Sequence, residues 1–179
     1  MHWVVHKFGG YSLANADCFQ NVFCLYQKLK IELKGGEDIA LVLSAMQGVT
    51  DMLLKSLEQS KERNQEFQKT LDQLQSKHFE AADKLLPTAS ILKEFQDSLK
   101  ADFKDISDIL RSVWLGKSYS SMNWDLVTGF GELWSNLLMR LYFKEKSEEA
   151  HLMNARDVLF IDSAPTGPLV DWKLSQERI

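Results

Sequence analysis

Two short apolar runs, each ending in a loop of small residues, constrain the fold of this chain most strongly. The first run, residues 3–5, leads into KFGG at residues 7–10, and the second is IALVL at residues 39–43. Short apolar runs that end in glycine or serine loops are typical of buried strands. Between them, apolar side chains recur at helical spacing over residues 19–33. Strand, helix and strand in this order predict a βαβ unit with parallel strands and a right-handed crossover.

Capping residues predict where the helices begin and end. Asn15 can cap the helix between the two strands, and Gly35 with Gly36 can end it. The loop after the second strand leads into another helix, which Thr50 or Asp51 can cap. We therefore expect both strands to lead, through a short loop, into a helix.

A long helical stretch follows the second loop. Apolar side chains recur at helical spacing in two stripes, one over residues 67–78 and one over residues 95–110. Pro87 lies between the stripes, and proline breaks a helix from within. Because the heptads are not sustained as in a coiled coil, the pattern predicts a helical hairpin inserted beside the sheet at about residues 51–116.

The last third of the chain begins with a strongly patterned helix. Residues 125–144 keep a wide apolar face, which suits packing against a sheet. After it, residues 150–153 and 158–161 are short strand candidates, and residues 162–167 read as a loop.

Length and composition limit the class of protein. The chain has 179 residues, 45% of them hydrophobic and 26% charged, which suits one soluble domain. A formal charge of −4 without a basic stripe argues against nucleic-acid binding. No apolar run reaches the roughly 18–20 residues of a membrane helix, and the first residues lack a signal-peptide pattern, so we expect a cytoplasmic protein that contacts no membrane. Two cysteines and four histidines show no zinc-binding spacing.

The two loops after the strands are the place where chemistry is expected. In open parallel sheets, ligands bind at the carboxyl ends of the strands, and loops that lead into helices there expose backbone amides to anions. Gly9, Gly10 and Gly48 allow the backbone to approach a phosphate closely, and Lys7 adds a positive charge at the same end. These are the groups that phosphoryl transfer requires. A glycine turn without a ligand remains the alternative on these residues alone.

Three segments resemble the signatures of the aspartokinases. Residues 5–12, VHKFGGYS, resemble the opening signature, whose usual form is KFGGTS. Residues 42–51, VLSAMQGVTD, resemble a second signature of the type VVSAMSGVTD. Residues 131–135, GELWS, resemble a third, in which Gly-Glu precedes a hydrophobic residue and a serine. The order of the segments matches, and residues 154–156, NAR, are similar to an Asp-Ala-Arg segment found later in that kinase domain.

The resemblance implies a fold and an extent. The expected fold is α/β, a truncated parallel-sheet domain of the amino-acid-kinase type, with helices on both faces of the sheet and the helical hairpin as an insertion. Residues 1–179 would form the N-terminal part of one such domain, without its C-terminal nucleotide-binding part or regulatory domains.

The resemblance also implies a reaction, the ATP-dependent phosphorylation of the L-aspartate side chain to 4-phospho-L-aspartate, on the route to lysine, threonine and methionine. ATP is the phosphoryl donor, and Mg²⁺ would bridge its phosphates. Two alternatives stay open. One is another phosphotransferase of the amino acid kinase superfamily, acting on glutamate, carbamate or a nucleoside monophosphate. The other is a binding or scaffold module without catalytic activity.

Four residues in the first loop are implied to bind the ATP phosphates. Lys7 would contact the phosphates and stabilise charge on the group in transfer, which makes it the implied catalytic residue. Gly9 and Gly10 would offer backbone contacts, with Ser12 nearby. The structural alternative for Lys7 is a solvated lysine at the end of a strand.

The implied aspartate site comes from the second loop and the third signature. Ser44 and Thr50 would hold the substrate, and Glu132 would bind its α-amino group. Arg156, in the NAR segment, is a further candidate residue whose alternative is a structural role. Ser44 and Thr50 are alternatively a loop residue and a helix cap, and Glu132 is alternatively an exposed helical glutamate.

The chain departs from the family pattern in three ways. Tyr11 replaces a threonine and brings a bulky ring to a loop usually lined by small side chains, and Gln47 replaces a serine. The family's GRGGSD segment, which supplies a catalytic arginine and aspartate, has no counterpart in residues 1–179. We therefore expect this polypeptide to be inactive alone. We also expect it to form a homo-oligomer, since a partial domain would leave a sheet edge unpaired and an apolar helix face underpacked. That face carries Phe130, Leu133, Trp134 and Leu137.

Overall fold

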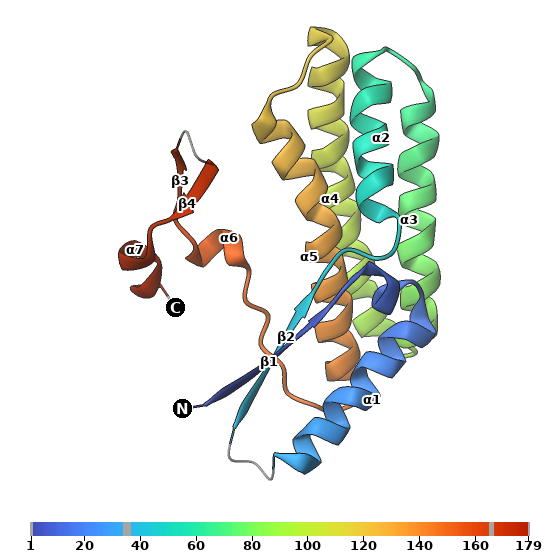
Figure 1. The fold of residues 1–179 in the computed structure, drawn as a ribbon. Coiled ribbons are helices and arrows are strands. Elements are labelled where there is room, and N and C mark those ends of the chain that lie inside the picture. Colours follow the sequence, from blue (N-terminus) through green and yellow to red (C-terminus); the bar gives the residue numbers. More distant parts are fainter. Residues whose placement is uncertain (1, 34–36, 165–166, 179) are drawn as a thin grey trace.

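The chain forms a small parallel sheet beside a group of long helices (Figure 1). The computed structural model describes residues 2–33, 37–164 and 167–178. The elements follow in the order β1 (Trp3–Phe8), η1 (Gly10–Leu13), α1 (Ala16–Glu32), β2 (Asp38–Leu43), α2 (Val49–Lys61), α3 (Glu66–Leu85), α4 (Ala89–Gly116), α5 (Ser121–Glu145), α6 (Ala155–Val158), β3 (Ile161–Ala164), β4 (Gly167–Val170) and α7 (Trp172–Gln176). This is the mixed α/β class that was predicted, with a short parallel sheet and mostly helices.

The predicted βαβ unit is confirmed. β1 and β2 pair in parallel, with a register that runs from Trp3 opposite Asp38 to Phe8 opposite Leu43. The helix between them begins where it was expected, because the Asn15 side chain accepts a hydrogen bond from the Cys18 amide at 3.0 Å. The glycines that were expected to end this helix lie outside the described residues.

The strands are less buried than their apolar sequences predict. β1 alternates between exposed and half-buried residues, and Trp3 and Val5 are 59% and 61% exposed. In β2, only Leu43 at the carboxyl end is buried. A two-stranded sheet has one neighbour for each strand, so its apolar side chains stay partly open to solvent.

The helical stretch contains three helices where a hairpin of two was predicted. Both predicted stripes are confirmed as core faces, and the break at Pro87 falls between α3 and α4. Their buried members are Phe67, Leu71, Leu74 and His78 in α3, and Phe95, Leu99, Phe103, Ile106 and Leu110 in α4. The helix expected after the second loop ends at Lys61, before α3 begins, and this break was not predicted. α2 packs on both α3 and α4.

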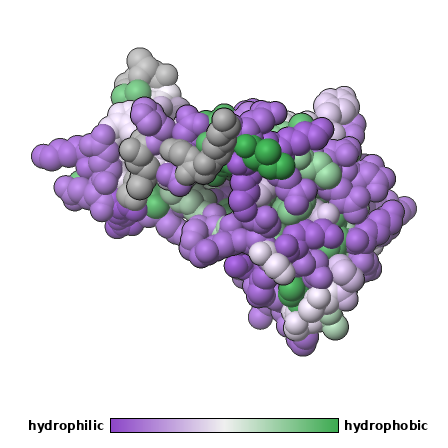
Figure 2. Space-filling model, turned by 90° about the horizontal axis from the view of Figure 1, so that it is seen from below, coloured by the Kyte–Doolittle hydropathy of each residue, from purple (hydrophilic) through white to green (hydrophobic). Residues whose placement is uncertain are grey.

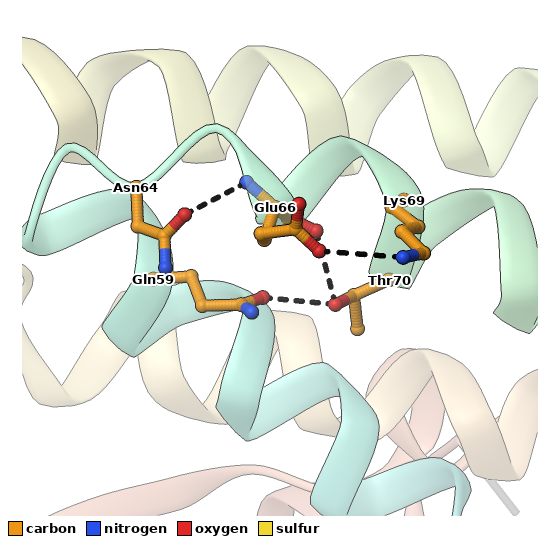
Figure 3. Close-up of polar contacts among 5 residues, drawn as sticks. All are labelled: Gln59, Asn64, Glu66, Lys69 and Thr70. Atoms are coloured by element: carbon orange, nitrogen blue, oxygen red, sulfur yellow. Dashed lines mark hydrogen bonds and ion pairs between the residues drawn. The ribbon is translucent and has the colours of Figure 1, made fainter.

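A turn stabilised by polar contacts separates α2 from α3 (Figure 3). Arg63 adopts a left-handed conformation with φ 55°, and its guanidinium donates to the carbonyls of Trp114 and Leu115 at the end of α4. The Thr70 hydroxyl donates to the Gln59 side chain at 2.9 Å across the turn. Because no glycine or proline marks this turn, the sequence pattern did not show it.

Two helix starts differ from the prediction. α2 begins at Val49 with Gly48 as its N-cap, so neither Thr50 nor Asp51 caps it. The helix predicted from residue 125 begins at Ser121, where a capping box joins the side chains and backbones of Ser120 and Asn123. The capping alternative for Thr50 is therefore wrong.

The broad apolar face of α5 packs against helices, not against a sheet as predicted. α5 lies mainly on α2 and α4 and makes fewer contacts with β2, among them a hydrogen bond to Leu43 at the carboxyl end of that strand. Trp134 is fully buried, stacks on Phe103 with the ring centroids 4.8 Å apart, and donates its indole N–H to Asp102 at 2.9 Å. Phe130 is buried beside it. Leu133 and Leu137, on the same face, are half-buried against the core. The expectation that this face would be underpacked is wrong, because α2 and α4 cover it.

The C-terminal part forms a separate small group of elements, seen to one side of the helices in Figure 1. Residues 150–153 form no strand, and residues 155–158 form the short helix α6, with Asn154 as its N-cap. The predicted loop at residues 162–167 instead contains most of β3, which pairs with β4 in antiparallel fashion. Local capping and hairpin pairing determine this part more than hydrophobic periodicity does.

Most of the buried hydrophobic residues come from the helices, so the core lies between them. The face shown in Figure 2 is mostly hydrophilic, with hydrophobic patches between the polar residues. Among the described residues, no helix combines the length and apolar character that crossing a membrane requires.

Candidate active site

The two predicted phosphate-binding loops lie side by side. β1 and β2 are parallel and in register, so both loops leave the same edge of the sheet. A Cβ atom added at Gly10 would lie only 3.0 Å from the backbone oxygen of Ala45 and 3.5 Å from the backbone of Gln47. A side chain at this position would therefore crowd the second loop, and glycine lets the two loops approach this closely. The structure brings Lys7, at the end of β1, to the same edge as the second loop.

The second loop presents the open N-terminus of α2. Gly48 caps this helix in a left-handed conformation with φ 76°, and no side chain caps it. The Val49 and Met52 amides donate to Met46 and Gly48. Within the described part of the chain, the amides of Thr50 and Asp51 have no acceptor. The positive end of the helix, with two such amides, suits a negatively charged group.

The first loop also offers backbone donors next to a cation. Gly9 precedes the short helix η1 without a side-chain cap, and the Ser12 amide donates to the Gly9 carbonyl at 2.9 Å. Lys7 is exposed and takes part in none of the ion pairs among the described residues. The ring of Tyr11 is 83% exposed, so it points into solvent and does not fill the loop. The tyrosine that replaces the family's threonine therefore leaves the backbone of the loop accessible.

Glu132 lies on the surface of α5, where that helix touches the second loop. At the preceding residue, Gly131, an added Cβ would lie 2.8 Å from the Ala45 Cβ and 2.9 Å from the Val49 Cγ1. The absence of a side chain therefore lets α5 rest directly on the loop. Glu132 is exposed beside this contact. A glycine in a helix interior usually has a packing reason, and this signal was available in the sequence.

The other two predicted substrate residues occupy opposite ends of the second loop. Ser44 is half-buried, and its amide extends the strand ladder by donating to the Phe8 carbonyl at 3.0 Å. Thr50 is exposed in the first turn of α2. The structure thus places Ser44 at the junction of sheet and loop, and Thr50 at the helix end that offers free amides.

Arg156 is not part of this arrangement but holds α6 on α5. Its guanidinium fills the notch left by Gly129, where an added Cβ would lie 2.2 Å from Nη2. It donates to the Leu126 carbonyl at 3.2 Å. Its Cζ lies over the Phe130 ring, 5.6 Å from the ring centroid. These contacts support the structural role for Arg156.

The site as a whole provides a cation, two amide-lined loops and one carboxylate. No group of three or more metal-ligating side chains occurs among the described residues. Binding of an anion at the loops, with an amino group held by Glu132, is the chemistry that these groups allow.

Comparison with known proteins identifies the family of this chain. Residues 2–179 match the model of the amino acid kinase family. The chain belongs to this family. Within it, the chain is 29% identical over 178 residues to the chloroplastic bifunctional aspartokinase/homoserine dehydrogenase 1 of Zea mays, covering 99% of this chain and 19% of that protein. It is 29% identical over 172 residues to bifunctional aspartokinase/homoserine dehydrogenase 2 of Escherichia coli, covering 96% of this chain and 20% of that protein.

Two solved structures of an amino acid kinase show the same fold. Aspartokinase III of E. coli in complex with lysine and aspartate aligns with a TM-score of 0.77 and 22% identity, covering 98% of this chain. The same enzyme in complex with aspartate and ADP aligns with a TM-score of 0.75 and 23% identity, covering 99% of this chain. The chain spans 36% of those aspartokinase chains and about a fifth of the bifunctional relatives.

Proposed function

We propose that this amino acid kinase domain is part of an aspartate kinase. In this reaction the side-chain carboxylate of L-aspartate attacks the γ-phosphorus of ATP, a new O–P bond forms, and ADP leaves. The observation that carries the proposal is the meeting of three elements at one edge of the sheet: the Lys7 loop, the open start of α2, and the Gly131 contact that sets α5 on the second loop. The naming of the relatives as aspartokinases supports aspartate as the acceptor.

The first loop would hold the phosphates of ATP. Lys7 would place its positive charge against them, and the backbone of Gly9 and Gly10 would approach them closely, with Ser12 beside the same loop. Phosphoryl transfer depends on positioning and on neutralising charge, which these groups provide. Bound Mg²⁺ would supply further charge neutralisation between the phosphates.

The second loop and α5 would hold L-aspartate. The Thr50 and Asp51 amides at the start of α2 suit a carboxylate, and the exposed Glu132 suits the α-amino group. Ser44 would contribute a hydroxyl at the junction of sheet and loop. Glu132 would attract the positive amino group and the start of α2 would attract a negative carboxylate, so together they suit an amino acid.

The wider setting is also a proposal. In it, the reaction begins the route to lysine, threonine and methionine in the cytoplasm. Because residues 1–179 lack the arginine and aspartate segment of the family, we expect this polypeptide to bind ligand without turning it over alone.

Calorimetric titration of L-aspartate into this polypeptide tests the substrate. We expect binding, on the order of 1 mM or tighter, and no comparable binding of L-glutamate. Glu132→Gln should weaken aspartate binding by about tenfold or more, since a hydrogen bond between charged groups is lost. Asp125→Asn is the matched control, because it removes the same charge from an exposed position on the same helix. Equal affinity for both amino acids, or equal effects of both substitutions, would contradict the proposal.

A further inference from the structure

Asn136, one turn after Glu132 on α5, makes the side-chain bond that ties this helix to β2. Its Nδ2 donates to the Glu132 carbonyl at 2.8 Å and to the Leu43 carbonyl at 3.2 Å. Both partners are carbonyl oxygens, which only accept, so the nitrogen of the amide must face them. An asparagine amide supplies two donors, and here both are used.

The Leu43 carbonyl accepts no hydrogen bond from β1. The Ser44 amide donates to the Phe8 carbonyl, so Ser44 faces β1. Successive residues of a strand direct their backbone groups to opposite sides, so the Leu43 carbonyl points away from β1. Leu43 is only 5% exposed. A carbonyl in such a place needs a partner, and Asn136 provides it.

Two contacts therefore hold α5 on the second loop, one on each side of Glu132. Gly131 rests against Ala45 and Val49 within the loop, and Asn136 is bonded to Leu43 where the loop begins. One contact alone would allow the helix to pivot, whereas two contacts five residues apart oppose rotation as well as separation. The backbone of Glu132 is thereby placed relative to residues 43–50.

We propose that Asn136 is a positioning residue that holds the Glu132 segment of α5 and residues 44–50 in a defined relative position. Asn136 need not touch the substrate, because it acts through the loop and through Glu132. The identity of the ligand, L-aspartate, rests on the proposed function, but the positioning role does not.

Asn136→Asp is the sharpest test, because it keeps the shape of the side chain and turns carboxylate oxygens toward two carbonyl oxygens. Asn136→Leu removes the donors without adding charge and gives a second measurement if the aspartate variant does not fold. Asn21→Asp is the control, since Asn21 is exposed on α1 and makes no side-chain hydrogen bond among the described residues.

Hydrogen exchange of single backbone amides reports on the loop. The Ser44, Val49 and Met52 amides are bonded to Phe8, Met46 and Gly48, so they are the reporters. With Asn136→Asp we expect these amides to exchange at least about tenfold faster, while amides in the middle of α4 keep their rates. Calorimetry should show that Asn136→Asp binds L-aspartate about tenfold more weakly. The reason is that Glu132 and the loop are displaced relative to each other, not that the whole fold is less stable. Asn21→Asp should leave both quantities unchanged.

The outcomes separate this proposal from the proposed function. Unchanged exchange of the three loop amides in Asn136→Asp overturns the positioning role, and so does an equal rise throughout the helices. If the loop amides alone exchange faster and the wild type binds no L-aspartate, the positioning role stands and aspartate as the ligand is wrong. If the loop amides exchange faster and aspartate binding weakens, both stand.

Discussion

Lowering the pH from 7 to 5 should destabilise this protein through one buried histidine. His78 lies on α3 without solvent exposure, edge-on to the Trp134 ring at 4.9 Å. Its Nδ1 is 2.7 Å from the Leu74 carbonyl, which only accepts, so Nδ1 carries the proton and Nε2 is bare. Nε2 has no hydrogen-bond partner among the described residues. A protonated ring would therefore bury a charge without compensation.

The pKa of His78 is lowered from 6.5 to about 4, mainly because the ring is buried. The hydrogen bond with Leu74 opposes this shift, and the nearby charge of Lys77 adds to it. The unfolded chain takes up this proton near pH 6.5, whereas the folded chain takes it up only near pH 4. The stability provided by the neutral ring is thus complete above pH 6.5 and is lost as the pH falls toward 4. At about 1.36 kcal/mol per pKa unit, the loss between pH 7 and pH 5 is about 2 kcal/mol.

Urea denaturation at pH 7, 6 and 5 measures this loss. His78→Gln keeps an amide donor for Leu74 but does not titrate, and His151→Gln is the control because the His151 side chain is 91% exposed. We expect the free energy of unfolding of the wild type and of His151→Gln to fall by about 2 kcal/mol more than that of His78→Gln. Carboxylates with lowered pKa, such as Glu94, act on all three proteins and cancel in the difference. The same pH dependence in all three proteins would refute the reasoning.

Three further predictions concern the site and the surface. Gly131→Ala should lower the free energy of unfolding by about 1–3 kcal/mol, because the new Cβ collides with Ala45 and Val49; a stabilised variant in urea denaturation would show the contact to be unimportant. In an active enzyme that contains this domain, Lys7→Ala should lower kcat/KM by on the order of a hundredfold, whereas the exposed Lys28→Ala should not; full activity of the first variant would exclude the phosphate role. The polypeptide should self-associate, since the two-stranded sheet has open edges and exposed apolar side chains; a constant monomer mass in light scattering over a tenfold concentration range would contradict this.

Local patterns in the sequence were sufficient for the βαβ unit, the first helix cap and the break between the two long helices. Short apolar runs that end in glycine loops mark strands that lead into helices. Asn15 and Pro87 determine a helix start and a helix break through their immediate neighbours. The apolar stripes of α3 and α4 were predictable for the same reason, because helical periodicity depends only on spacing along the chain. The candidate loops followed from these elements, since parallel strands bring their carboxyl ends to one edge.

Tertiary contacts decided the features that the sequence left open. The turn between α2 and α3 depends on Arg63 reaching the end of α4. The broad face of α5 was predicted to pack on a sheet, but α2 and α4 cover it. Gly131 and Asn136 have partners more than 80 residues earlier in the chain, and for Asn136 the separation is 93 residues. Periodicity cannot show contacts at such a separation. Short-range patterns determine which segments become helices or strands because those preferences are set by neighbouring residues, whereas the packing of one segment on another depends on side chains that only folding brings together.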